Sequence, residues 1–204
     1  MKYSKRKLLN LSLICALISA MMLSMVGFSY SCNEMYDNII RIRIIPNSDS
    51  KEDQALKIAI RDAVLGKTSE LFTDTKSYDD AVAVTKSNTD KMLTAAKNVV
   101  RSEGLEYDVT LEIREEFFDT RVYEEFTLPA GYYETAVFTV GEGKGSNWWC
   151  VIYPQVCVGS CSATLNESLS DDTAEVAYNS EKYVVKFKTI EILEKIKKCF
   201  NLSK

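Results

Sequence analysis

The sequence contains no histidine among its 204 residues. This absence excludes Ser–His–Asp and Cys–His catalytic groups, acid–base pairs that use an imidazole, and zinc sites that need His ligands. Proline and glycine are also scarce, with three and eight residues, and no internal repeat or low-complexity run is visible. Any catalytic chemistry would therefore rest on side chains other than histidine.

The first residues predict export. Residues 1–7 carry four basic residues and no acid, and residues 8–26 are apolar apart from Asn10 and a few serines. The apolar run is longer than a signal-peptide core of about 7–15 residues and close to the roughly 20 that span a bilayer. Residues 1–31 are therefore a signal peptide or an N-terminal membrane anchor, and the small residues Ser29 and Ser31 favour cleavage. The remainder is expected outside the cytoplasm, because positive residues stay inside.

The exported part is acidic. Four of the 25 Lys and Arg residues lie in residues 1–7, which leaves 21 against 29 Asp and Glu, a net charge of about −8. Because nucleic-acid binding depends on basic surfaces that neutralise phosphates, nucleic acid is not an expected partner.

Cysteine usage favours disulfides. Cys15 lies within the apolar run, which leaves five cysteines in the exported part, namely Cys32, Cys150, Cys157, Cys161 and Cys199. Cys150 and Cys157 lack the two-residue spacing of redox and zinc sites. We predict a disulfide between them, which would stabilise the fold by roughly 2.5 kcal/mol in the chain-entropy model. Five is odd, so at least one thiol is free or pairs with another chain. No metal site is predicted.

Periodicity predicts a small set of strands and helices. Residues 39–45 alternate isoleucine with arginine and predict a strand with one buried face. Ser50 with Asp53, and Ser77 with Asp80, have the spacing of helix starts. The two helices are expected to end near Gly66 and Gly104.

Further strands are predicted at residues 107–113, 133–140 and 148–153. The last two, joined by the glycine-rich residues 141–147, predict a hairpin. A final helix within residues 181–200 is expected to pack on the sheet. The fold class is therefore α+β, a single layer domain whose sheet contains an antiparallel hairpin and packs against two to three helices. We assign the core to residues 38–158, and a loop with the C-terminal helix to residues 159–204.

Three features could carry a site. The glycines around Lys144 do not have the P-loop spacing, so a structural turn is the better interpretation. Trp148 and Trp149 could stack on sugars, but neighbouring strand residues point to opposite faces, so one of them belongs to the core. The glutamates of residues 112–125 could supply a glycosidase pair, although such clusters are commonly solvated.

Three separate blocks of this sequence resemble one family. They are IRIRIIPNSDS at residues 40–50 with EDQ at 52–54 and RD at 61–62, LPAGY at 128–132, and GEGKG at 141–145 running into NWWCV at 147–151, with Pro154 and Cys157 following. Together they resemble the stage II sporulation protein R family. The likeness covers residues 39–157, and residues 159–179 match no motif of the family.

The resemblance implies a signal rather than an enzyme. Members of that family are made in the forespore, exported into the space between the two membranes, and needed to activate a membrane-embedded aspartic protease in the mother-cell membrane. That protease cleaves the precursor of sigma-E. The resemblance implies no catalytic residue and no cofactor, and any contact with the membrane would come through the N-terminal segment.

Polar loops on a rigid scaffold commonly carry recognition. We therefore place the partner-binding surface on the turn after the first strand and on the glycine-rich loop. The candidate residues are Asn47, Asp49, Asp53, Lys144, Asn147 and Trp148. Two alternatives stay open, a septal peptidoglycan-binding or hydrolytic protein and a purely structural envelope protein.

Overall fold

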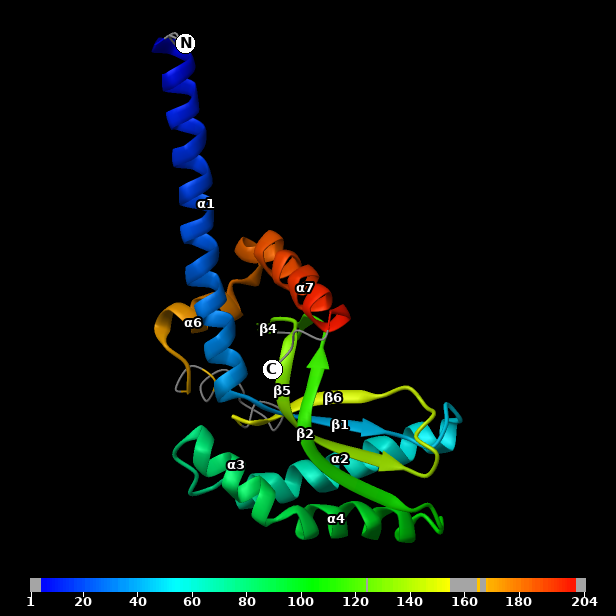
Figure 1. Cartoon of the computed structure of the whole chain (residues 1–204). Helices are drawn as coiled ribbons and strands as arrows, with labels where there is room; N and C mark the ends of the chain where they lie inside the picture. Colours follow the sequence, from blue (N-terminus) through cyan, green and yellow to red (C-terminus); the bar gives the residue numbers. More distant parts are fainter. Residues whose placement is uncertain (1–4, 124, 155–164, 166–167, 201–204) are drawn as a thin grey trace.

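The computed structural model describes residues 5–123, 125–154, 165 and 168–200. A four-stranded mixed sheet stands between two groups of helices, and a long N-terminal helix projects away from it (Figure 1). The helices are α1 (Lys5–Asn38), α2 (Lys51–Leu71), α3 (Tyr78–Ser87), α4 (Thr89–Ser102), α6 (Asp171–Tyr178) and α7 (Val184–Cys199), with a 3-10 turn η1 (Ser180–Tyr183). The strands are β1 (Ile40–Ile45), β2 (Val109–Phe118), β3 (Arg121–Val122), β4 (Thr127–Leu128), β5 (Gly131–Val140) and β6 (Trp148–Tyr153). The predicted α+β class is confirmed.

Strand β1 occupies a central position that the sequence did not predict. The strand order is β2-β5-β1-β6, with β1 parallel to β5 and antiparallel to β6. The predicted hairpin between residues 133–140 and 148–153 is therefore wrong, because β1 lies between its two strands. The connection of residues 141–147 is long enough to cross the end of β1, and it hydrogen-bonds to the residues that follow that strand.

The first core fills one face of the sheet. Ile40, Ile42 and Ile44 are fully buried there, as the alternating pattern of β1 requires. They pack against α2, α3 and α4, chiefly through Leu56, Ile60, Val64, Ala81, Met92, Ala96 and Val100. This layer holds β1 rigidly and so fixes where the turn after it begins.

The two predicted helix starts are confirmed. The side chain of Ser50 accepts a hydrogen bond from the backbone N–H of Asp53, and that of Ser77 accepts one from Asp80. Gly66 does not end α2, because the buried side chains around it, including Thr68, continue the packing face. That burial outweighs the roughly 1 kcal/mol that a glycine costs inside a helix.

The second predicted helix is two helices that meet at Asn88. The backbone N–H and the side-chain amide of Asn88 both donate to the carbonyl of Val84, which ends α3. Gly104 follows α4 with φ 72°, a conformation that glycine adopts without strain. Strand β2 is longer than predicted, because it pairs with β5 along its whole length.

The second core lies on the opposite face and brings the C-terminal end of α1 together with α6 and α7. The last turns of α1 are buried in it through Phe28, Ser31, Cys32 and Met35. Helices α6 and α7 pack beside them, with Val176, Ala177, Phe187 and Ile190 buried. The last helix was predicted to pack on the sheet, and only part of it is buried, because Leu193, Ile196 and Phe200 are exposed.

Helix α1 is long and apolar enough to cross a membrane, and its most apolar stretch is almost entirely exposed. Its length differs from the predicted leader of residues 1–31, since the helix continues unbroken to Asn38. The segment predicted to be cleavable therefore lies inside a helix whose C-terminal end is part of the second core.

Candidate functional site

The turn after β1 and the loop between β5 and β6 form one unit, here called the loop pair and defined as residues 46–54 and 141–147. The backbone N–H groups of Lys144 and Gly145 donate to the carbonyls of Asn47 and Pro46, at 3.1 and 3.0 Å. At Gly145 a Cβ atom would stand 2.2 Å from the carbonyl oxygen of Ser48. The two loops approach so closely that only glycine fits at this position.

Side chains lock the loop pair further. Asn47 Oδ1 accepts a hydrogen bond from the backbone N–H of Glu142 at 3.0 Å, and Asp49 Oδ1 accepts one from Ser146 at 2.6 Å. From α2, Lys57 Nζ donates to the carbonyl of Ser146 at 2.9 Å. Backbone donors of the glycine-rich loop therefore find their acceptors on residues of the first turn, and the pairing fixes the loop shape.

Asp53 is the centre of the first turn. Its side chain is buried, with the residue 3% exposed, and Oδ2 accepts hydrogen bonds from Ser48 Oγ and from Asn47 Nδ2. Burial acts to raise the pKa of Asp53, but the hydrogen bonds from Ser48 and Asn47 outweigh it and hold the pKa below its ordinary value. Asn47 and Asp53, predicted to bind a partner, thus bind neighbours within the chain.

Lys144 and Glu142 form the exposed tip of the loop pair. Their side chains are 72% and 68% exposed, and their charged ends lie 2.7 Å apart. The hydrogen bond from Lys144 lowers the pKa of Glu142, and the same contact raises the pKa of Lys144. Both groups carry their full charge at neutral pH and are open to a partner.

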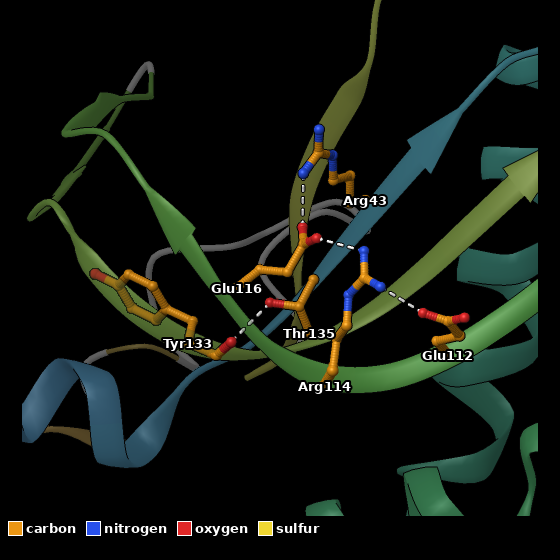
Figure 2. Close-up of polar contacts among 6 residues, drawn as sticks. All are labelled: Arg43, Glu112, Arg114, Glu116, Tyr133 and Thr135. Atoms are coloured by element: carbon orange, nitrogen blue, oxygen red, sulfur yellow. Dashed lines mark hydrogen bonds and ion pairs between the residues drawn. The ribbon is translucent and has the colours of Figure 1, made fainter. Parts of the chain in front are cut away.

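A row of charged side chains, here called the charge ladder, connects β1 with β2. Its members are Arg43, Glu112, Arg114 and Glu116. Arg43 Nη1 contacts Glu116 Oε2 at 2.8 Å, and Arg114 Nη2 contacts Glu116 Oε1 at the same distance. Glu116 therefore lies between two guanidinium groups, as Figure 2 shows. Arg114 also pairs with Glu112. Burial acts to raise the pKa of Glu116, and the bonds from Arg43 and Arg114 outweigh it and lower the pKa.

Asn147 connects the loop pair to the ladder. With its amide oxygen facing Arg43, that oxygen lies 2.6 Å from Nη2 and 3.1 Å from Nε of the guanidinium. The sequence prediction named Asn147 but not Arg43, Glu112, Arg114 or Glu116. The alternation along the first strand placed its arginines on the face opposite the buried isoleucines, without partners. Ion pairs between side chains of β1 and β2, which lie on either side of β5, cannot be predicted from the sequence without the strand order.

The two tryptophans point to opposite faces, as predicted. Trp148 packs against the first core, with Arg61 Cζ 5.5 Å from its ring centroid. Trp149 packs against the second core, with Arg121 Cζ 4.1 Å from its ring centroid. Each ring therefore already has partners within the chain, which disfavours a shared sugar platform.

Only one cysteine of the predicted disulfide, Cys150, lies among the described residues. Cys150 is buried and disulfide-bonded. Cys157 and Cys161 lie outside the described residues, so the pairing of Cys150 with Cys157 stays a prediction. Cys15, Cys32 and Cys199 are free thiols.

Arg41 is a buried cation that sequence reasoning missed. It is fully buried, Nη2 donates to the hydroxyl of Tyr123 at 2.7 Å, and Cζ lies 3.8 Å from the ring centroid of Phe118. Neither Nε nor Nη1 has a hydrogen-bond partner among the described residues. Arginine is rarely buried completely, so no sequence signal could have placed it in the second core.

The pKa shifts of the described carboxyl groups lend no support to the predicted glycosidase pair. Every carboxyl whose pKa departs from its ordinary value is shifted downward, as at Glu34, Asp49, Asp53, Glu116, Glu142 and Glu191. A general acid needs a raised pKa. Within the described ranges, no group of three or more Cys, Asp or Glu side chains is arranged to hold a metal ion.

Comparison with known proteins identifies the family. The family model described as stage II sporulation protein R matches residues 36–163, more than half of the chain. The stage II sporulation protein R of Bacillus subtilis (strain 168) is 38% identical over 121 residues, which cover 59% of this chain and 54% of that protein. The match thus spans about half the length of the curated relative, and no solved structure matches. The matched range contains both loops of the loop pair and the whole charge ladder, and the chain belongs to the stage II sporulation protein R family.

Proposed function

We propose that this protein is an exported signal of the forespore, which activates a membrane-embedded aspartic protease in the facing mother-cell membrane and so starts the processing of pro-sigma-E. The observation that carries the proposal is the family match over residues 36–163. The helix that precedes the matched range, long and apolar enough to serve as signal or anchor, supports an extracytoplasmic location.

The proposal needs a binding surface and no reaction centre. The downward-shifted carboxyl groups, and the absence of histidine from the sequence, both favour a protein that acts by contact. The septal peptidoglycan alternative draws no support from Trp148 and Trp149, whose rings pack on opposite cores. Binding of the purified full chain to peptidoglycan sacculi, or release of muropeptides from them, would favour that alternative.

We assign the contact with the protease to the exposed tip of the loop pair. Glu142 and Lys144 stand out from a loop whose backbone is fixed by Asn47, Asp49 and Gly145. A rigid loop loses little conformational entropy on binding, so it can present charges to a partner efficiently. Asn47 and Asp53 act in this proposal by holding the loop and not by touching the partner.

We further propose that α1 is retained as an anchor. Glu34 accepts hydrogen bonds from the backbone N–H and the hydroxyl of Ser170 at 2.6 and 2.7 Å, and from the hydroxyl of Thr173. These contacts, and the buried Phe28, tie α1 to α6 and α7 on both sides of the predicted cleavage point. Cleavage there would remove Phe28 from the second core.

The test is reconstitution in a host that does not sporulate. The full chain is expressed with the protease and the sigma precursor, and cleavage of the precursor is measured by immunoblot. We expect cleavage to depend on the full chain and to be absent when residues 1–26 are deleted, because that form stays in the cytoplasm. Absence of cleavage with the exported chain, or equal cleavage with the cytoplasmic form, would contradict the proposal.

The same assay tests the contact surface. Replacing Glu142 and Lys144 together by alanine should lower cleavage several-fold at an unchanged amount of folded protein. The matched control replaces Lys67 and Glu70, an ion pair on the surface of α2, and should leave cleavage unchanged. Equal activity of the two double variants would remove the tip from the contact.

A further inference from the structure

Helix α7 carries an apolar face that the protein itself leaves uncovered. Outside α1, the described residues expose eight large apolar side chains, and six of them lie on α7 or at its C-cap: Val184, Val185, Ile192, Leu193, Ile196 and Phe200. Val185, the most exposed of the six at 79%, is followed at intervals of seven and four residues by Ile192 and Ile196. This spacing places the three on one face, opposite the buried Phe187 and Ile190.

Lysines border this face on both sides. At 100° per residue, Lys188 and Lys195 fall on one flank and Lys186 and Lys197 on the other. The acidic residues of the helix lie elsewhere. The side chains of Glu191 and Glu194 are 13% exposed and lie toward the second core; Glu191 pairs with the flanking Lys188 and Lys195, and Glu194 with Lys197. The uncovered face is therefore apolar along its centre and cationic at its edges.

The position of α7 relates this face to the membrane helix. Lys186 Nζ donates to the carbonyl of Ser24 at 3.3 Å, and the ring of Phe28 packs edge-on against Phe187 with centroids 5.0 Å apart. Ser24 and Phe28 stand where the exposed apolar stretch of α1 gives way to its buried end. Figure 1 shows α7 beside α1 where that helix leaves the rest of the molecule.

We propose that α7 is an interfacial helix that lies on the surface of the membrane entered by α1. An apolar stripe with lysines on both flanks is the pattern of helices that lie in the headgroup region, where the stems of lysine side chains reach past the apolar surface. The occupant is lipid and not protein, because α7 contacts α1 at Ser24 and Phe28, next to the exposed apolar stretch of that helix, and the carboxylates of α7 lie away from the uncovered face. The inference rests on the proposed retention of α1.

The consequence is a fixed orientation of the domain. With α1 alone the domain could tilt where that helix leaves the bilayer, whereas a second contact with the membrane surface limits the tilt. The loop pair follows the C-terminal end of β1, and α1 joins β1 at its opposite end, so the glycine-rich loop is held away from the anchor (Figure 1). A signal that must meet a partner in a facing membrane gains from that arrangement.

The test measures contact with lipid, residue by residue, in the full chain. Single cysteines are introduced as Val185→Cys, Ile192→Cys or Ile196→Cys after Cys15 and Cys199 are replaced by serine, and each is labelled with nitrobenzoxadiazole. The protein is reconstituted into vesicles of phosphatidylcholine and phosphatidylglycerol that contain a lipid with a nitroxide high on its acyl chain. Val122→Cys, 77% exposed on β3, is the matched control, and Leu17→Cys reports whether α1 is in the bilayer.

We expect the nitroxide to quench the three probes on α7 strongly and the probe at residue 122 no more than a soluble dye. Quenching at residue 17 with none on α7 would overturn the interfacial helix and leave the anchor intact, whereas no quenching at residue 17 would overturn both. Probes on α7 that are shielded from water but unquenched would assign the face to a protein partner or a second copy of the chain, and would likewise overturn the proposal.

Discussion

Asp49 and Ser146, 97 residues apart in the sequence, are joined by a 2.6 Å hydrogen bond from the backbone N–H of Ser146 to the carboxylate of Asp49. The bond lowers the pKa of Asp49 and connects two segments that carry much of the family likeness. It implies that the two segments act as one unit. Changes in either loop should therefore alter the shape of both.

Gly145→Ala should separate the two loops. The new Cβ would meet the carbonyl oxygen and carbon of Ser48 at 2.2 and 2.6 Å, and backbone atoms cannot move aside as a flexible side chain can. We expect a loss of roughly 2–4 kcal/mol in the free energy of unfolding, in the range of severe overpacking. Urea unfolding of the full chain in detergent, followed by tryptophan fluorescence, measures the change.

Gly66→Ala is the matched control for that variant. Gly66 lies inside α2, and no atom stands within 4 Å of the position that its Cβ would take. Removing a helical glycine should stabilise the protein by about 0.5–1 kcal/mol. A destabilisation as large as that of Gly145→Ala would show that the effect is not specific to the contact between the loops.

Asp53→Asn should make the protein less sensitive to acid. The folded-state pKa of Asp53 lies below its ordinary value of 3.8, so its contribution to stability is fully present above that value and is lost as the pH falls through the lower, folded pKa. Asparagine keeps the shape but not the charge that strengthens the bonds from Ser48 and Asn47. We expect a loss of about 1–2 kcal/mol at pH 7.

The difference between Asp53→Asn and the native protein should therefore shrink below about pH 4, since protonated Asp53 resembles asparagine. Unfolding curves of both proteins between pH 7 and pH 3 give this difference directly. Other carboxyl groups with a lowered pKa, such as Glu34 and Glu116, are present in both proteins, so their contributions cancel in the difference between the two unfolding free energies. A difference that stayed constant down to pH 3 would mean that Asp53 is not the titrating group.

The parts of the fold that depend on local sequence were predicted well. Caps at Ser50 and Ser77, the strand of alternating isoleucines and the end of β6 before Pro154 all follow from interactions within a few residues. Strand order does not, because residues 141–147 could close a hairpin or cross a third strand with similar turn chemistry. The error at the hairpin thus comes from contacts that no local pattern encodes.

The candidate site shows the same division. The two loops were predicted from their polarity and glycines, but their roles were not, since the hydrogen bonds of Asn47 and Asp49 reach residues almost a hundred positions away. The charge ladder was missed because Arg43 and Glu116 belong to strands separated by β5. Composition identifies charged residues, and only the strand order shows which of them meet.

The ladder makes its own prediction for Arg43 and Glu116. The side chain of Glu116 is 11% exposed, and it accepts bonds from two guanidinium groups. A double-mutant cycle with Arg43→Met and Glu116→Gln should give a coupling energy of about 1 kcal/mol, above that of most surface pairs. The exposed pair of Lys144 and Glu142 is the control and should give no measurable coupling. Equal coupling in both pairs would mean that partial burial adds nothing to the ladder.

Phe28→Ala distinguishes a retained α1 from a cleaved one. Phe28 is 3% exposed and packs on Phe187 and Tyr183, so its truncation should cost about 3–4 kcal/mol wherever α1 remains part of the protein. Leu17→Ala, at a position 71% exposed, should leave the unfolding of the domain unchanged. Both variants are purified from the membranes of an exporting host, weighed by mass spectrometry and unfolded in detergent. If the exported protein had lost residues 1–31, the two variants would have identical masses and stabilities, because neither substitution would survive in the mature chain.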